Sequence, residues 1–248
     1  MSRTMLVVLA IAAMGAMVGC GCEKQAAAPQ PVAPAPAKAA PAPAVPAKAA
    51  PAPAAPAAPV PVKQVTFDFD LEKAGQVPQG WTAAGGTWKV AADPTAPSKG
   101  QVISQTAASP STDYNVVLAG DSKLKDVDIT LKLRPMSGRG DQGGGPMWRA
   151  TDARNYYVAR WNPLEGNYRL YKVVDGTRTQ LATTNVATVP TGWHTMRVTM
   201  QGDAVTCWFD GREVLSAKDA TFAAAGKVGL WTKGDAATNF DDFSVTGR

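Results

Sequence analysis

The stretch Val127-Asp128-Ile129-Thr130-Leu131-Lys132-Leu133-Arg134 alternates strictly between apolar and polar side chains. Successive side chains of a β-strand point to opposite faces of its sheet. The alternation therefore predicts a strand with one buried and one solvated face. Because a single such strand needs a partner layer to cover its apolar face, the rest of the chain has to supply further strands.

Further segments show the same alternation, or are rich in β-branched and aromatic residues: Val65 to Phe69, Val102 to Gln105, Asn115 to Leu118, Tyr156 to Trp161, Tyr168 to Val174, His194 to Met200, Val205 to Phe209, Lys227 to Thr232 and Phe240 to Thr246. Turn signals such as Asp175-Gly176 and Asp210-Gly211 separate them. No helical period is sustained beyond one or two turns. We predict an all-β fold, an antiparallel β-sandwich or jelly roll.

The N-terminus carries a cationic residue at Arg3, an apolar run from Met5 to Val18, and small residues before Cys20. This pattern is a secretory signal. Because its last residue is Cys20, it resembles a bacterial lipoprotein signal, which implies cleavage after residues 1–19 and lipidation of Cys20. Two or more acyl chains anchor firmly, at roughly 0.8 kcal/mol per buried methylene. Simple secretion, with Cys20 and Cys22 as an incidental pair, is the alternative.

We therefore expect the protein in a bacterial cell envelope, with the membrane as a partner through the lipid. Gly21 would be the second residue of the mature protein. An Asp at this position resembles the inner-membrane retention signal of enteric lipoproteins. Because Gly21 is not Asp, an outer-membrane location is favoured if the cell is Gram-negative. Residues 20–63 then form the lipidated N-terminus and a linker rich in Ala and Pro. Without apolar periodicity this linker is expected to be disordered and to span on the order of 100 Å. A Pro-rich docking ligand is the alternative.

Residues 64–248 are long enough for one buried core and form the predicted sandwich domain. They contain 20 Lys and Arg against 19 Asp and Glu, so the alkaline character of the chain comes from its N-terminal part and predicts no nucleic-acid partner. Cys207 is the only cysteine of the domain, and its place on a strand beside Val205 and Phe209 favours a buried, inert thiol over a nucleophile.

Four short motifs follow one another along the C-terminal part of the domain: Trp193-His194, Asp210-Gly211, Gly226 to Trp231 and Phe240 to Phe243. In this order the domain resembles the concanavalin A-like lectin and glucanase sandwiches, including laminin G-like domains. With Asn155-Tyr156-Tyr157, Arg160 and Asn167-Tyr168-Arg169 it is most similar to the bacterial 3-keto-disaccharide hydrolase domain family. The resemblance implies the fold. It leaves activity open, since many relatives resemble glycan binders without catalysis.

Catalytic groups are sparse. Retaining glycosidases need two carboxylates about 5 Å apart. Asp126 and Asp128, two positions apart on one strand face, come nearest to that pattern in this sequence. His194 is the only histidine, so a site with several imidazoles is excluded and a catalytic triad would depend on this residue. Glu165 in the predicted hairpin 162–167 is the other weak catalytic candidate. We assign no catalytic residue and favour a protein that is not an enzyme.

Sugars are bound by aromatic faces and by planar side chains that hydrogen-bond to hydroxyl groups. Strand alternation places such side chains on common faces, and we predict that they meet in one carbohydrate-binding groove: Arg149, Tyr156, Arg160, Arg169, Tyr171, Trp231 and Lys233. In the alternative, the aromatic residues belong to the core and the arginines to the rim.

Four aspartates lie on the first and last predicted strands, which are commonly neighbours in such sandwiches: Asp68, Asp70, Asp241 and Asp242. Together with carbonyl groups they would suit calcium, which takes six to eight oxygen ligands. Solvated strand-end charges are the alternative. Apart from this structural calcium, no cofactor is expected.

Three functions follow: carbohydrate binding, cleavage of 3-keto-disaccharides, and a structural or protein-binding role in the envelope. Cleavage predicts a carboxylate or His194 in the groove beside an arginine. Binding predicts aromatic and amide side chains without a poised base, and a structural role predicts a filled or flat face.

Overall fold

The structure, a computed structural model, describes residues 62–98, 100–187 and 191–248. The predicted signal peptide, the lipidation site Cys20 and nearly all of the Ala/Pro-rich linker lie outside these residues. Among the described residues no helix is long and apolar enough to cross a membrane.

The described residues form strands joined by turns and irregular loops: β1 (Lys63–Phe67), β2 (Trp81–Ala83), β3 (Trp88–Ala92), β4 (Gln101–Gln105), β5 (Tyr114–Ala119), β6 (Val127–Ser137), β7 (Gly145–Asp152), β8 (Asn155–Asn162), β9 (Asn167–Val174), β10 (Thr177–Asn185), β11 (His194–Gln201), β12 (Ala204–Phe209), β13 (Arg212–Lys218), β14 (Lys227–Lys233) and β15 (Ala237–Gly247). The all-β prediction is confirmed.

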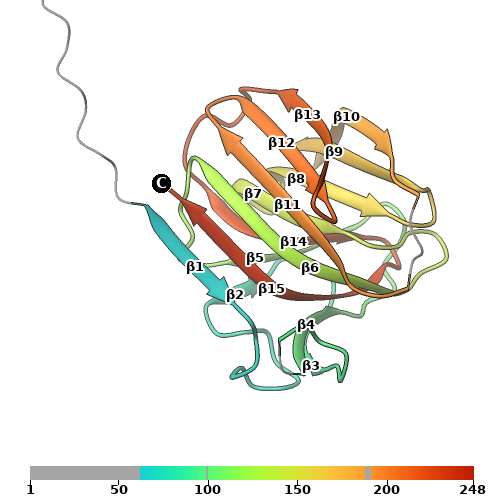
Figure 1. Cartoon of the computed structure of the whole chain (residues 1–248). Helices are drawn as coiled ribbons and strands as arrows, with labels where there is room; N and C mark the ends of the chain where they lie inside the picture. Colours follow the sequence, from blue (N-terminus) through green and yellow to red (C-terminus); the bar gives the residue numbers. More distant parts are fainter. Residues whose placement is uncertain (1–61, 99, 188–190) are drawn as a thin grey trace, which may run out of the picture. The chain divides into compact units, whose positions relative to one another are not determined.

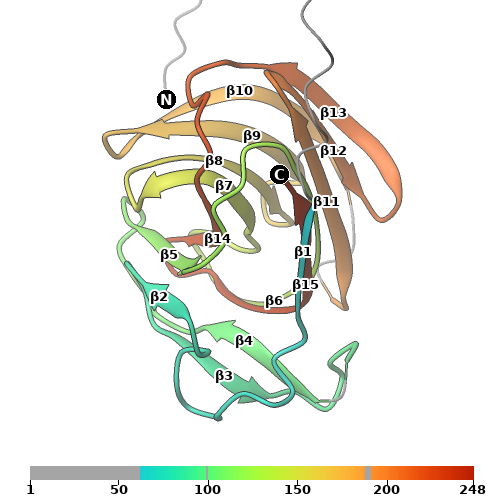
Figure 2. The same cartoon turned by 90° about the vertical axis from the view of Figure 1, so that its left-hand side faces the viewer.

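The strands make two antiparallel sheets that pack face to face (Figures 1 and 2). The eight-stranded sheet has the order β13-β12-β11-β6-β15-β4-β3, and β1 also pairs with β15. The long strand β15 pairs with both strands along the same edge: Thr238 to Phe240 pair with β4, and Phe243 to Gly247 pair with β1. The seven-stranded sheet has the order β10-β9-β8-β7-β14-β5-β2. This is the predicted antiparallel sandwich.

The alternating stretch 127–134 lies in β6, in the middle of the eight-stranded sheet between β11 and β15. Its four apolar side chains are at most 4% exposed, and they pack in one core with Trp148, Tyr157 and Leu170 of the other sheet. Each fully buried side chain of this size contributes roughly 1.5–3 kcal/mol. The inter-sheet core thus explains why the pattern of 127–134 is so regular.

The predicted Asp-Gly turns are confirmed by the backbone. Asp175 and Asp210 have φ angles of 49° and 47°, and the glycines after them have φ angles of 81° and 78°. Two consecutive residues with positive φ are typical of the type I′ hairpin turn, which matches the twist of the flanking strands.

Candidate functional site

The seven-stranded sheet buries a second cluster of side chains besides the inter-sheet core. Its members come only from β5, β7, β8, β9 and β14, so they lie on the outer face, away from the other sheet: Val116, Leu118, Met147, Ala150, Tyr156, Val158, Tyr171, Val173 and Trp231. The indole N–H of Trp231 donates to the hydroxyl of Tyr156 at 3.1 Å. Burial raises the pKa of Tyr156, so its hydroxyl stays protonated.

An arginine lies over this aromatic cluster. The guanidinium of Arg178, on β10, is 4.3 Å from the ring centre of Tyr171 and 5.6–5.8 Å from the rings of Tyr114 and Trp231. Cation–π contacts of this kind hold the cation over the aromatic faces. The outer face therefore presents an arginine above a group of aromatic rings.

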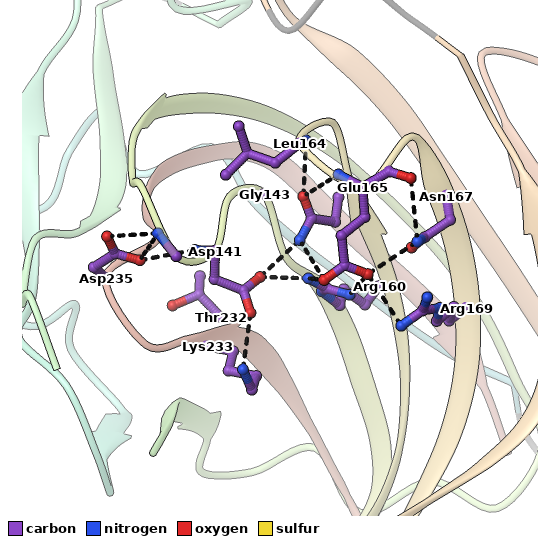
Figure 3. A network of polar contacts seen from close by, with 12 residues as sticks. Asp141, Gly143, Arg160, Leu164, Glu165, Asn167, Arg169, Thr232, Lys233 and Asp235 are labelled. Atoms are coloured by element: carbon purple, nitrogen blue, oxygen red, sulfur yellow. Dashed lines mark hydrogen bonds and ion pairs between the residues drawn. The ribbon is translucent and has the colours of Figure 1, made fainter. Parts of the chain in front are cut away.

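A group of charged and amide side chains lies beside the aromatic cluster, and we call it the Arg160 cluster (Figure 3): Asp141, Arg160, Asn162, Glu165, Asn167, Arg169 and Lys233. Arg160 forms ion pairs with Asp141 and, at 3.1 Å, with Glu165. Glu165 also pairs with Arg169 at 3.0 Å, and Asp141 with Lys233 at 3.0 Å. These pairs make one continuous network.

One hairpin amide and one aspartate fix the geometry of this network. The side-chain oxygen of Asn162 accepts the backbone N–H groups of Leu164 and Glu165, which shapes the β8–β9 turn. The carboxylate of Asp235 accepts the backbone N–H groups of residues 139–141, at 2.6 Å from Arg139 and 2.8 Å from Asp141. Asp141 is thereby presented from a loop that is held at its backbone.

The electrostatics of Glu165 bear on its chemistry. Partial burial raises the pKa of its carboxyl, but the hydrogen bond from Asn167 and the positive charges of Arg160 and Arg169 outweigh burial and lower it. Glu165 is therefore ionised at neutral pH and is a weaker base than an isolated glutamate. Its side chain is 39% exposed, so it remains accessible from outside.

The run Gly143-Gly144-Gly145 lies at the edge of this cluster. Gly143 and Gly144 have φ angles of 73° and 154°, and the backbone of Gly144 exchanges hydrogen bonds with that of Trp161. The run thus brings the loop close to β8, with Gly143 beside the Arg160 cluster (Figure 3).

The structure brings most of the sequence-derived binding candidates to this one face: Tyr156, Arg160, Arg169, Tyr171, Trp231 and Lys233. Arg149 is different. It has a φ angle of 48° at an irregularity of β7, and its guanidinium donates to the backbone carbonyls of Lys125, Gly202 and Phe222. Because the irregularity interrupts the alternation of β7, the side chain of Arg149 does not line the outer face. It instead links three loops through its hydrogen bonds.

His194 is not brought near Glu165. Its Nδ1 lies 2.8 Å from the carboxylate of Asp210, and its ring packs against Phe209 and Trp161. Trp161 belongs to the inter-sheet core, whereas its neighbour Arg160 faces outward. The two catalytic candidates thus lie on opposite sides of the seven-stranded sheet.

Three of the four aspartates considered for calcium meet at the hydroxyl of Ser98, which lies 3.3 Å from the backbone carbonyl of Asp68, and the fourth lies apart. Asp70 and Asp241 share the hydroxyl of Ser98, at 3.2 Å each, while Asp242 pairs with Lys132 at 2.8 Å. Burial raises the pKa of Asp241, which disfavours its charge. In the described part of the chain no group of three or more His, Cys, Asp or Glu residues is placed to bind a metal. The calcium site therefore stays a prediction.

Sequence reasoning missed several participants of the outer face, among them the amides Asn162 and Asn167 of the β8–β9 turn. Asp141 comes from a loop, and Tyr114 and Arg178 lie on strands whose sequence neighbours gave no sugar-binding signal. The sequence does contain a signal for Arg178. The two-residue turn Asp175-Gly176 places Arg178 opposite Val173 on the neighbouring strand.

A two-sheet sandwich of this topology is a concanavalin A-like domain of the kind found in carbohydrate-binding modules and glycanases. The module CBM66 from Bacillus subtilis is similar with a TM-score of 0.57 at 21% identity, over 70% of this chain and 98% of that one. Residues 64–246 match the sequence pattern of the 3-keto-alpha-glucoside-1,2-lyase-like domain, and the chain belongs to this family.

Two further solved structures share the fold. Domain 4 of AbnA, a GH43 extracellular arabinanase from Geobacillus stearothermophilus solved with arabinotriose, has a TM-score of 0.52 at 14% identity, over 75% of this chain and 93% of that one. The β-glucanase of Bacillus licheniformis has a TM-score of 0.51 at 12% identity, over 75% and 98%. None of the curated proteins matches this chain.

Proposed function

We propose that the outer face of the seven-stranded sheet binds a carbohydrate, and that a lipid on Cys20 holds the domain in a bacterial cell envelope. The observation that carries the binding proposal is the meeting of the aromatic cluster with the Arg160 cluster on one sheet face. Guanidinium, amide and carboxylate groups bind vicinal hydroxyls of sugars. The aromatic rings beneath them are buried, with Tyr156 and Trp231 both 0% exposed, and support these groups from below.

Two of the similar solved structures support carbohydrate binding as the type of function. One is a carbohydrate-binding module, and another was solved with an arabinose trisaccharide. At these identities they establish a shared fold, so the residues of this chain carry the argument. The fixed network around Arg160 is suited to binding because its side chains are already held in place before a ligand arrives.

The second candidate function is cleavage of a 3-keto-glucoside, which family membership favours. A base would remove the proton on C2, next to the C3 ketone. The electron pair would then form the C1–C2 double bond as the C1–O bond breaks and the aglycone leaves. Glu165 lies beside Arg160 and Arg169, as this reaction requires, but its lowered pKa weakens it as a base. We therefore rank binding first.

A glycan array probed with the full chain in detergent micelles tests binding, followed by calorimetry on any hit. We expect Arg169→Ala to weaken binding at least about tenfold. Arg197→Ala is the matched control, because Arg197 is a half-exposed arginine on β11 of the other sheet. Equal affinity of wild type and Arg169→Ala would refute the proposed face.

Product analysis with 3-keto-glucosides separates the two functions. Binding alone predicts no double-bond product from wild type. Release of the aglycone by wild type, abolished in Glu165→Gln with the fold retained, would instead establish cleavage.

The anchor needs its own test. Cells fed an alkyne-bearing fatty acid should label the wild-type chain and leave Cys20→Ala unlabelled. Equal lack of label in both would favour simple secretion.

A further inference from the structure

The outer face has an excess of hydrogen-bond donors without partners. Three guanidinium nitrogens are buried and make no hydrogen bond: Nε of Arg160, Nε of Arg169 and Nη1 of Arg178. Among the described residues of this face, Oδ1 of Asn167 is the one comparable acceptor. Arg160 itself is only 1% exposed. Buried donors without partners are costly, so a ligand that supplies acceptor oxygens would gain from meeting them.

The charges of the face are unbalanced in the same sense. The face carries four cationic side chains, Arg160, Arg169, Arg178 and Lys233, and the two carboxylates of Asp141 and Glu165. Both carboxylates are already shared, since each pairs with two cations. Counting Asp152 as well, whose charge reaches Tyr156 on the same face, leaves the sum positive.

Arg169 and Arg178 flank one tyrosine. The guanidinium of Arg169 donates to the hydroxyl of Tyr171 at 3.4 Å, and that of Arg178 lies over the ring of the same residue. Among the described residues, no carboxylate lies within ion-pair distance of Arg178. Its positive charge is held by aromatic rings alone, which leaves its N–H groups available for an anion.

We infer that the carbohydrate bound at this face carries a carboxylate, as in a uronic-acid glycan, and that Arg178 and Arg169 bind that carboxylate beside Tyr171. This inference deepens the proposed function and depends on it. A carboxylate matches the planar donor geometry of arginine and supplies the acceptor oxygens that the face lacks. A neutral sugar would leave the charge of Arg178 without an anion.

The test uses matched pairs of ligands with the full chain in detergent micelles. Fragments of polygalacturonate, alginate and hyaluronan are each compared with their carboxyl-reduced, neutral forms by calorimetry. We expect at least one acidic fragment to bind, and its neutral form to bind at least about tenfold more weakly. Because the attraction is electrostatic, raising the salt from 50 to 500 mM should reduce the preference.

Two variants make the test specific. Arg178→Gln should cut the preference for the acidic form to about threefold or less, with an unchanged circular dichroism spectrum. Arg212→Gln removes the same charge from an exposed position on β13 of the other sheet and should keep the preference. Loss of preference in both variants would show a long-range charge effect and overturn the assignment to Arg178.

The outcomes separate this inference from the proposed function. Equal binding of acidic and neutral forms overturns the inference and leaves carbohydrate binding intact. Binding of neutral glycans alone does the same. If no glycan of either kind binds, both the inference and the proposed function are refuted.

Discussion

Arg160 and Asp141 form an ion pair whose two side chains are only 1% and 3% exposed. Asp141 also accepts a hydrogen bond from Asn162 and pairs with Lys233, so one carboxylate serves three partners. Buried charges are tolerated when they are paired and hydrogen-bonded. The pair thus joins the loop before β7 to strands β8 and β14, and it sets the shape of the candidate site.

Removing the acidic partner should be strongly destabilising. In Asp141→Ala, Arg160 and Lys233 lose a shared counter-charge in a buried setting, and we expect a loss of about 3–5 kcal/mol in the free energy of unfolding. Asp128→Ala is the control, because its pair with Arg197 is 41% and 46% exposed and should cost at most about 1 kcal/mol. Urea unfolding measures both. Similar losses would mean that burial of the pair does not matter.

How far the sequence predicts the fold depends on where a strand lies. β6 is central and has one face in the core, so its alternation is complete and predicts the strand. β10 is an edge strand in which most side chains are exposed or half-exposed, and its polar sequence Thr177–Asn185 shows no such pattern. The sequence patterns do not predict β2, β3 and β13 either, which are short or near the sheet edges. They also give no bounds for β7, which is central but buried on both faces over residues 145–150, so that its sequence does not alternate. Alternation of apolar and polar residues marks a strand with one buried face, and edge strands bury few of their side chains.

The candidate site was predictable in the same measure. Alternation placed Arg160 and Arg169 on one face because β8 and β9 pair in regular register. It failed for Arg149, where an irregularity of β7 redirects the side chain. The contribution of Asp141 depends on the path of a loop, which local sequence does not determine.

The acid sensitivity of the fold should depend on Asp219. Burial raises the pKa of its carboxyl, but hydrogen bonds from Lys172, Thr221 and Tyr157 outweigh burial and lower it well below its usual range. A carboxyl with a lowered pKa in the folded state stabilises the fold above the unfolded pKa of about 3.9. That contribution is lost as pH falls through the folded pKa.

We therefore expect Asp219→Asn to be less stable than wild type at pH 7, and the difference to shrink below about pH 4. Urea unfolding at pH 7, 5, 4 and 3 measures this, with the exposed residue Asp121, changed to Asn, as control. A difference that stays constant down to pH 3 would contradict the role of ionised Asp219.

Cys207 should be chemically inert in the folded protein. Its side chain is in the inter-sheet core, and burial raises the pKa of the thiol to about 12. Since the thiolate is the reactive form, native protein should leave Cys207 unmodified by iodoacetamide at pH 8, whereas urea-unfolded protein should react fully. Mass spectrometry of the peptide that contains it measures this.

A neighbouring position provides the control for Cys207. In Thr206→Cys with Cys207→Ala, the thiol is on the half-exposed opposite face of β12 and should react without urea. Equal reaction of the native wild type would refute burial of the thiol.

Gly143 should be intolerant of any side chain. Its φ angle of 73° disfavours other residues, and a Cβ atom there would lie 2.3 Å from the carbonyl oxygen of Trp161. Gly166 isolates the first effect, since it has a φ angle of 61° but no atom within 4 Å of an added Cβ. We expect Gly166→Ala to lower the free energy of unfolding by about 1–2 kcal/mol and Gly143→Ala to lower it by about 1–3 kcal/mol more, because the backbone of β8 has to move.

The movement of β8 in Gly143→Ala would also displace the loop that carries Asp141. Gly143→Ala should therefore weaken glycan binding at temperatures where it remains folded, while Gly166→Ala should weaken it less. Thermal unfolding and calorimetry on both variants measure this, and equal costs in stability would show that the close approach to Trp161 does not constrain the site.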